Sequence, residues 1–357
     1  MKKTFYLIVL SALLLSFNSC LNNDTKKSSD FEKLDIACDY NLYSVSFINE
    51  DIGFVGGGDQ YNHVLFKTTD GGITWDNIYI DDFISPIDNS VDAICFTSEN
   101  IGYLMFGIDA YKTSDQGETW NKMNGFFQRN LHFSCVDTGF THNSDSEAKI
   151  YYTFDGGQNW DRYPEGTFKS TIEDGDLWIE GVQFLTNNSR IGFAFDQNGE
   201  IFITRNGGQS WEIYNKDWIA LNKNNYGEYP VKAMFFISEL EGFIFNDEGI
   251  FKTTDGCESF TLINSLNLHI NNQRIGGDLK ISYPEGNNIY FLGNENIYKT
   301  ENQFIKNSKL SVEDLDNKYE VYVEVYNFTM ASNKIGYAVG YESDEDSRGA
   351  AVLKYSK

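Results

Sequence analysis

Basic residues are scarce in this sequence. Its 357 residues include 28 Lys and Arg against 52 Asp and Glu, which gives a formal net charge of −24, and only six of the basic residues are Arg. Such an acidic surface argues against nucleic acid or an anionic membrane surface as a partner. The shortage of Arg also argues against a rich anion-binding surface. Solubility alone is an equally good reason for the charge.

Proline is rare as well, with 4 residues, whereas Phe (28) and Tyr (22) are abundant. No stretch carries long helical periodicity of its apolar residues. This composition favours many short strands joined by Gly and Asn turns.

Motifs for metals and catalysis are also missing. The sequence has no Cys-x-x-Cys pair, no His/Cys cluster, no EF-hand spacing in its acidic segments, no phosphate-binding glycine loop and no nucleophile elbow. We therefore expect neither a metal nor a cofactor. Besides Cys20, an even set of cysteines permits disulfides in an exported chain. Their setting favours free, mostly buried thiols instead: Cys38, Cys95, Cys135 and Cys257.

The first twenty residues have the layout of a secretory signal peptide. Lys2 and Lys3 precede an apolar run over 5–15, and Ser19 comes just before Cys20. A cysteine at this junction resembles a bacterial lipoprotein signal, in which Cys20 is the lipidated first residue; an ordinary cleaved signal is the alternative. The sequence then divides into a signal (1–19), a polar tether (20–30) and a domain (31–357). The resemblance implies a protein anchored to the bacterial outer membrane, on its periplasmic or outer side.

One element recurs along the whole domain. Residues 67–75 read Lys-Thr-Thr-Asp-Gly-Gly-Ile-Thr-Trp, and copies follow at 112–120, 153–160, 204–211 and 253–260, with a remnant at 299–301. The first side chain of its turn can accept hydrogen bonds from the backbone of that turn, and Gly after it permits a positive φ. We therefore assign these side chains a structural role: Asp70, Asp115, Asp155, Asn206 and Asp255.

We call each copy of this element a box. Before each box stands a second sequence marker, an aromatic residue that is followed six or eight positions later by Gly. Six pairs have this form, Phe47/Gly53, Phe96/Gly102, Phe133/Gly139, Phe184/Gly192, Phe236/Gly242 and Phe328/Gly336, and Tyr283/Ile289 is a seventh, imperfect pair. Each unit reads as four short strands. The sequence thus predicts an all-β, seven-bladed β-propeller of four-stranded antiparallel blades.

The two ends of the domain complement each other. The last unit stops at its third strand, near 352–355, and residues 31–36 look like the segments that follow the boxes. We therefore expect the N-terminal strand to complete the last blade and close the ring.

The box pattern is similar to the Asp-box, or BNR, repeat of sialidases, sortilin-type receptors and several glycosidases. Together with the Ile-Gly-Phe-Val-Gly-Gly stretch over 52–57, it most closely resembles the photosystem II stability/assembly factor-like propellers. That resemblance implies a non-catalytic binding or assembly protein. The photosynthetic members are expected to use an Arg-rich face, which this chain does not have. The six scattered Arg residues also lack the cluster and the Arg-Ile-Pro motif of sialidases.

Candidate binding residues lie in the long loops between units and at the start of each first strand. The loops supply aromatic side chains such as Trp178 and Trp218, which could bind a ligand or simply anchor the loops. Positions four residues before each marker should surround the mouth of the central channel, either as a belt of ion pairs or as a polar funnel that contacts a ligand. The sequence places these residues there: Tyr43, Asp92, Arg129, Glu180, Lys232 and Glu324.

Two functions are compatible with these features. The first is a monomeric, envelope-anchored scaffold that binds a protein or a glycan through its loop-rich face. The second is a glycan-acting hydrolase with two carboxylates in the funnel, about 5–10 Å apart.

Overall fold

The structure is a computed structural model, and we describe it from the first strand onward. It describes residues 31–59, 61–80, 90–125, 131–133, 135–142, 150–164, 167–168, 179–185, 188–196, 199–215, 231, 233–246, 249–264, 281–282, 289–293, 296–301, 306–310, 322–343 and 348–356. The signal, the tether and Cys20 lie outside these residues. None of the described residues belongs to a helix long and apolar enough to cross a membrane.

The described residues form seven four-stranded antiparallel sheets, and six of them follow the chain in order. Sheets 1 to 3 are β2 (Leu42–Phe47), β3 (Gly53–Gly58), β4 (His63–Thr68) and β5 (Asp76–Asn77); β6 (Val91–Phe96), β7 (Gly102–Phe106), β8 (Asp109–Thr113) and β9 (Asn121–Lys122); and β10 (Leu131–Phe133), β11 (Gly139–His142), β12 (Ile150–Thr153) and β13 (Asp161–Arg162).

Sheets 4 to 6 repeat the same order. They are β14 (Ile179–Leu185), β15 (Asn188–Asp196), β16 (Ile201–Thr204) and β17 (Glu212–Asn215); β18 (Ala233–Phe236), β19 (Gly242–Asn246), β20 (Gly249–Thr253) and β21 (Thr261–Asn264); and β22 (Ile281–Ser282), β23 (Ile289–Gly293), β24 (Asn296–Glu301) and β25 (Lys306–Leu310).

Sheet 7 joins the two ends of the domain. It contains β26 (Tyr322–Met330), β27 (Ile335–Ser343) and β28 (Arg348–Ser356), and β1 (Phe31–Leu34) is its outermost strand. β1 runs antiparallel to β28, with Phe31 opposite Tyr355 and Leu34 opposite Val352. The N-terminal strand therefore pairs with the last sheet, as the sequence predicted.

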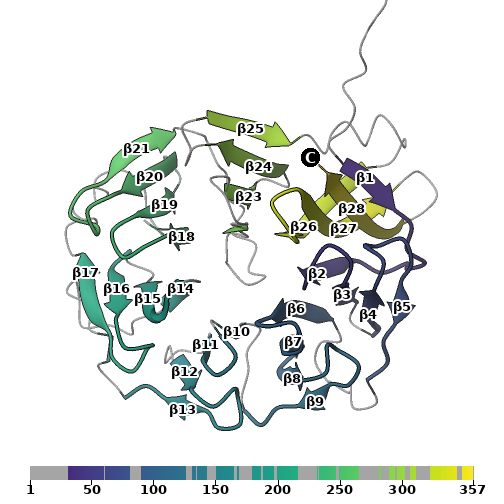
Figure 1. Ribbon diagram of the computed structural model, residues 1–357, viewed down its shortest axis with the longest axis horizontal. Helices are drawn as coiled ribbons and strands as arrows, with labels where there is room; N and C mark the ends of the chain where they lie inside the picture. The colour runs from purple at the N-terminus through teal and green to yellow at the C-terminus, as the bar shows by residue number, and fades with distance from the viewer. Residues whose placement is uncertain are drawn as a thin grey trace, which may run out of the picture.

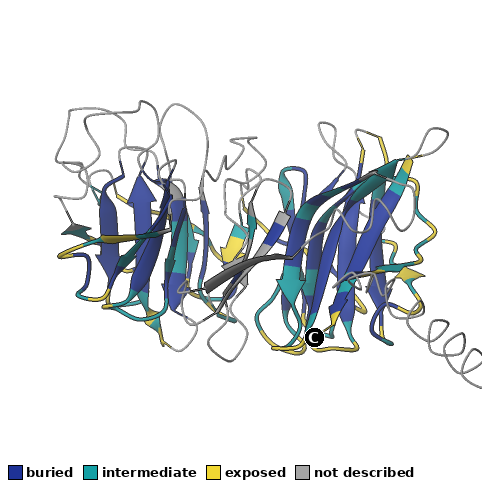
Figure 2. Ribbon diagram, turned by 90° about the horizontal axis from the view of Figure 1, so that it is seen from above, coloured by how far each residue is buried: buried dark blue, intermediate teal, exposed yellow. Residues whose placement is uncertain are grey.

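The sheets stand around a central opening, with the first strand of each sheet innermost and the last outermost (Figure 1). Buried residues fill the middle strands, and exposed residues gather in the turns at the edge where the C terminus lies (Figure 2). The all-β, propeller-like architecture expected from the repeats is confirmed.

Aromatic stacking joins neighbouring sheets. Each marker Phe lies over the Gly of its own sheet, where a Cβ at Gly53, for example, would come within 2.4 Å of the Phe47 ring. Its other face stacks on the residue after the marker Gly of the preceding sheet. The ring pairs, with their centroid distances, are Phe47–Tyr337 (3.5 Å), Phe96–Phe54 (4.9 Å), Phe133–Tyr103 (3.5 Å), Phe184–Phe140 (4.8 Å) and Phe236–Phe193 (3.7 Å).

The marker of sheet 7 differs from the one expected. Gly336 is opposite Met330, and a Cβ there would lie 2.5 Å from the Met330 sulfur, whereas Phe328 pairs with Ala338. The assignment of Phe328 was wrong by two residues. Met330 thus takes the place of the marker Phe beside the buried ring of Tyr290, and a cavity of about 10 Å³ remains at this contact.

Substituting Met330→Phe should stabilise the fold. The new ring would fill the cavity and restore the stack that the other contacts have, so we expect the unfolding midpoint to rise by about 1–3 °C in thermal denaturation. Met330→Ala should lower it by enlarging the cavity. A lower midpoint for Met330→Phe would show that the contact between sheets 6 and 7 has no room for a ring.

Deleting residues 31–36 should lower the unfolding midpoint by several degrees. The deletion uncovers the edge of β28 and removes Phe31, which is 3% exposed and contacts the Tyr355 ring. Deleting residues 21–26 of the tether serves as the control and should leave the midpoint unchanged. Equal midpoints for the two deletions would contradict a structural role for β1.

Candidate functional site

The five boxes share one hydrogen-bond network. In the first, Asp70 accepts hydrogen bonds from the Thr74 backbone N–H (2.9 Å) and hydroxyl (2.6 Å), while the Thr68 hydroxyl accepts one from the Gly72 N–H (2.8 Å). Equivalent bonds recur in the other four boxes. In the fourth, Asn206 replaces Asp and its amide donates to the Ser210 hydroxyl instead of accepting from it. The box side chains therefore serve their own turns.

Positive φ angles are required at two successive positions of each box. Gly71 and Gly72 have φ of 71° and 86°, a region that glycine adopts without strain. In two boxes a residue other than Gly occupies one of these positions, Gln116 (φ 59°) and Cys257 (φ 65°). These departures from the repeat are tolerated without a change in the network.

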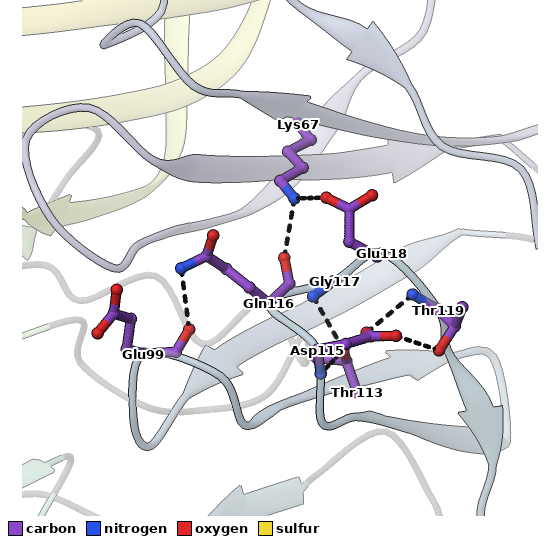
Figure 3. Close-up of polar contacts among 8 residues, drawn as sticks. All are labelled: Lys67, Glu99, Thr113, Asp115, Gln116, Gly117, Glu118 and Thr119. Atoms are coloured by element: carbon purple, nitrogen blue, oxygen red, sulfur yellow. Dashed lines mark hydrogen bonds and ion pairs between the residues drawn. The ribbon is translucent and has the colours of Figure 1, made fainter.

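Lysines tie three of the boxes to the preceding sheet. The buried Lys67 donates to the Gln116 carbonyl (3.0 Å) and forms an ion pair with Glu118, both in the box of sheet 2 (Figure 3). Lys112 and Lys354 make the corresponding bonds to the carbonyls of Gly156 (2.9 Å) and Gly71 (3.1 Å). Box-face polar groups are thus used for packing between sheets.

The box turn and the first hairpin of each sheet lie on the same face. A backbone bond joins them in five sheets, for example from the Gly71 N–H to the Asp51 carbonyl (2.8 Å) and from the Gly256 N–H to the Leu240 carbonyl (2.9 Å). The opposite face carries the second hairpins and the starts of the first strands.

Those strand starts are bulged. An extra residue interrupts the pairing with the second strand at Tyr43, Asp92, Glu180 and Tyr326. Bulges are common at the rims of β-structures, where they re-aim a side chain. Three of these are positions the sequence chose for the channel mouth. In sheet 7 the sequence chose Glu324, but because its marker is Met330, Tyr326 holds the equivalent place.

Of the other predicted site residues, the structure describes only some. Arg129, Lys232, Trp178, Trp218 and the side chain of Glu180 lie outside the described residues. Asp92 is half-buried and accepts a hydrogen bond from the Ser90 hydroxyl.

Three tyrosines come together between sheets 7 and 1, and we call them the tyrosine arc: Tyr43, Tyr326 and Tyr341. The Tyr43 and Tyr326 ring centroids are 5.4 Å apart, and those of Tyr326 and Tyr341 are 5.9 Å apart. The Asn327 amide donates to the Tyr43 carbonyl (3.1 Å), which joins β26 to β2. Sequence reasoning found Tyr43 and missed the other two.

Two glycines lie opposite the bulges that carry Tyr43 and Tyr326. Gly57 and Gly340 each stand four residues after the marker Gly of their sheets, and a Cβ would lie 1.9 Å from the Asn41 carbonyl oxygen or 1.7 Å from that of Glu324. Only glycine lets the bulged first strand come this close. These two glycines could have revealed the pair of bulges.

Two acidic residues that are close in the chain are shut off from solvent. Asp196 and Glu200, in the β15–β16 turn, are fully buried, and Asp196 accepts a hydrogen bond from the Glu200 backbone N–H (2.7 Å). Among the described side chains, no group of three or more His, Cys, Asp or Glu is arranged to hold a metal.

The cysteines match the expectation in part. No disulfide joins any of the four described cysteines. Only Cys257 is buried, and burial raises its pKa; the other three are half-buried, so "mostly buried" was wrong.

Comparison with known proteins shows which family this chain resembles. The model of the photosynthesis system II assembly factor YCF48 family matches residues 23–174. A curated relative, the photosystem II assembly lipoprotein Ycf48 of Prochlorococcus marinus, is 25% identical over 199 residues, which cover 50% of this chain and 57% of that protein. This chain is similar to the Ycf48 propellers, and it spans 57% of the length of that curated relative.

Solved structures agree with this Ycf48-like fold. A structure of YCF48 bound to a D1 peptide is 17% identical, covers 93% of this chain and 98% of that one, and has a TM-score of 0.61. YCF48 from Cyanidioschyzon merolae is 14% identical, covers 91% and 98%, and also has a TM-score of 0.61. At these identities the structures establish the fold of this Ycf48-like propeller.

Acid should destabilise the boxes. Hydrogen bonds from Thr74 lower the pKa of Asp70, and in Asp155 bonds from Asn159 outweigh desolvation and lower the pKa to about 2. Because these folded-state values lie below the unfolded value of about 4, their stabilisation is present above pH 4 and is lost as the pH falls toward 2.

The triple variant Asp70→Asn, Asp115→Asn, Asp255→Asn tests this. Asn206 already fills the equivalent place, where its amide donates to the Ser210 hydroxyl (2.8 Å). We expect a midpoint near that of the wild type at pH 7 and a smaller loss between pH 4 and pH 2, measured by thermal denaturation. The corresponding Ala variants should lose stability already at pH 7. An acid response equal to that of the wild type would contradict the assignment.

Proposed function

We propose that this chain is a non-catalytic binding or assembly scaffold that holds a protein partner at the face opposite the boxes. The observation that carries the proposal is the division of labour between the two faces. Box carboxylates and lysines are engaged in bonds within and between sheets. The tyrosine arc, in contrast, is only partly buried and lies beside the bulges of β2 and β26.

The relatives support a protein as the partner. YCF48 has been solved with a D1 peptide bound, and the curated relative is an assembly lipoprotein. This chain has a net charge of −24 and six Arg residues, which argues for a different partner from that of an Arg-rich face. We infer a partner protein of the cell envelope whose contacting segment is neutral or basic.

The same proposal includes the domain plan. Residues 1–19 are the lipoprotein signal, Cys20 is lipidated and residues 20–30 tether the domain to the outer membrane. The seven sheets are then the blades of one monomeric propeller over 31–357, and β1 closes its ring. A closed ring holds the innermost strands in fixed positions, which suits a rigid binding surface.

A glycan is the alternative ligand, since tyrosine rings also stack on sugars. The hydrolase reading is weaker, because the buried Asp196 and Glu200 are sealed from solvent within the described structure. A glycan would therefore be bound by this face without being cleaved.

Capture from envelope extracts would test the proposal. The bait is residues 21–357 without Cys20, and the matched variant is Tyr43→Leu/Tyr326→Leu, checked for an unchanged unfolding midpoint. We expect one envelope protein to be enriched by the wild type, confirmed by binding of the purified partner, and a glycan array to be silent. Binding to one glycan class, with no partner protein, would overturn the protein reading.

A further inference from the structure

The tyrosine arc is more exposed than most of the ring stacks between sheets. In those stacks most rings are buried, as with Tyr103 and Tyr337, each 1% exposed. Tyr43, Tyr326 and Tyr341 are half-exposed, and their rings are tilted by 33° and 31° along the row.

Backbone structure fixes this surface in place. Tyr43 and Tyr326 are both bulge residues, on strands that are neighbours around the ring. Asn41 donates to the Tyr43 hydroxyl (3.2 Å), and Asn327 donates to the Tyr43 carbonyl (3.1 Å). Gly57 and Gly340 lie opposite these two bulges, and the contact between β2 and β26 places the bulges side by side.

Carboxylates flank the arc. Glu324 stands directly opposite Tyr341 in the β26–β27 register, and neighbours of this kind have side chains on one face of the sheet. On the other side Asp92 occupies the bulge of β6, the strand next to β2: the Ser44 hydroxyl donates to the Val91 carbonyl (3.0 Å). Within sheet 7, Lys33 forms an ion pair with Glu342, which joins β1 to β27.

Aromatic faces beside carboxylates recognise cations. The chain already uses this chemistry internally, where Lys67, Lys112 and Lys354 lie 5.4–5.6 Å from the centroids of aromatic rings. The net charge of −24 would attract a cation and repel a polyanion. We propose that the tyrosine arc binds a Lys or Arg side chain of an extended segment of a partner protein. This inference rests on the proposed function and adds the chemistry of the partner.

Peptide titration tests the proposal directly. The protein is residues 21–357 without Cys20, and the probe is a fluorescein-labelled peptide of alternating Gly and Lys, matched with the same peptide carrying Gln for Lys. Fluorescence polarisation should show tighter binding of the Lys peptide by about 2- to 30-fold per engaged cation, weakening at high salt. Equal binding of the two peptides would overturn the proposal.

Substitutions locate the binding. Tyr326→Leu should lose the preference for Lys, whereas Tyr326→Phe, which keeps the aromatic face, should retain it. Tyr79→Leu is the control, since Tyr79 is 82% exposed and follows the outermost strand of sheet 1. Equal losses in the Leu and Phe variants, or a loss in the Tyr79 control, would contradict a cation site on the arc.

Two outcomes separate this inference from the proposed function. If Tyr326→Leu captures the envelope partner as well as the wild type does, the cation site is wrong while the scaffold function stands. If the wild type binds neither the Lys peptide nor any partner, and cellohexaose or chitohexaose binds instead, both are overturned.

Discussion

The stack of a marker ring on the aromatic residue of the preceding sheet is the contact on which the ring of sheets depends. It is available because Gly lies beneath each marker, so the ring can rest flat on its own sheet and offer its other face to the neighbour. The box Trp then packs edge-on against the same ring, at 5.9–6.4 Å between centroids in sheets 1 to 4. Flat stacking is uncommon for isolated ring pairs; here the sheets themselves impose it.

The polar contacts of the box face follow from this geometry. Once two sheets are stacked through their rings, the lysine at the end of a third strand reaches the box carbonyl of the next sheet, as Lys67 does with Gln116. Tyr337 adds bonds to the carbonyls of Glu50 (3.0 Å) and Gly71 (3.1 Å), which join sheet 7 to sheet 1. A face so committed to packing is poorly suited to exchange partners, which is why we place binding at the opposite face.

Much of the fold was readable from the repeat. The boxes marked each third hairpin, and the resemblance of 31–36 to the segments after the boxes predicted the pairing of β1 with β28. The error at Phe328 has a simple cause. An aromatic residue was expected as the marker, but the pairing of β26 with β27 decides the position, and it puts Met330 opposite Gly336. The place of the candidate site was less readable: the sequence analysis named Tyr43 and Asp92 as candidates and did not name Tyr326 or Tyr341, which the structure places beside Tyr43.

The sequence by itself determined the local elements of this protein: the box turns, the strands between them and the acidic surface. These depend on residues close together in the chain, such as Asp70 and Thr74, so their chemistry is visible in the spacing. Only the tertiary structure decided that Tyr43 lies against Tyr326, which is far away in the sequence. Strand pairing sets the bulges, and packing of sheet 7 on sheet 1 brings them together.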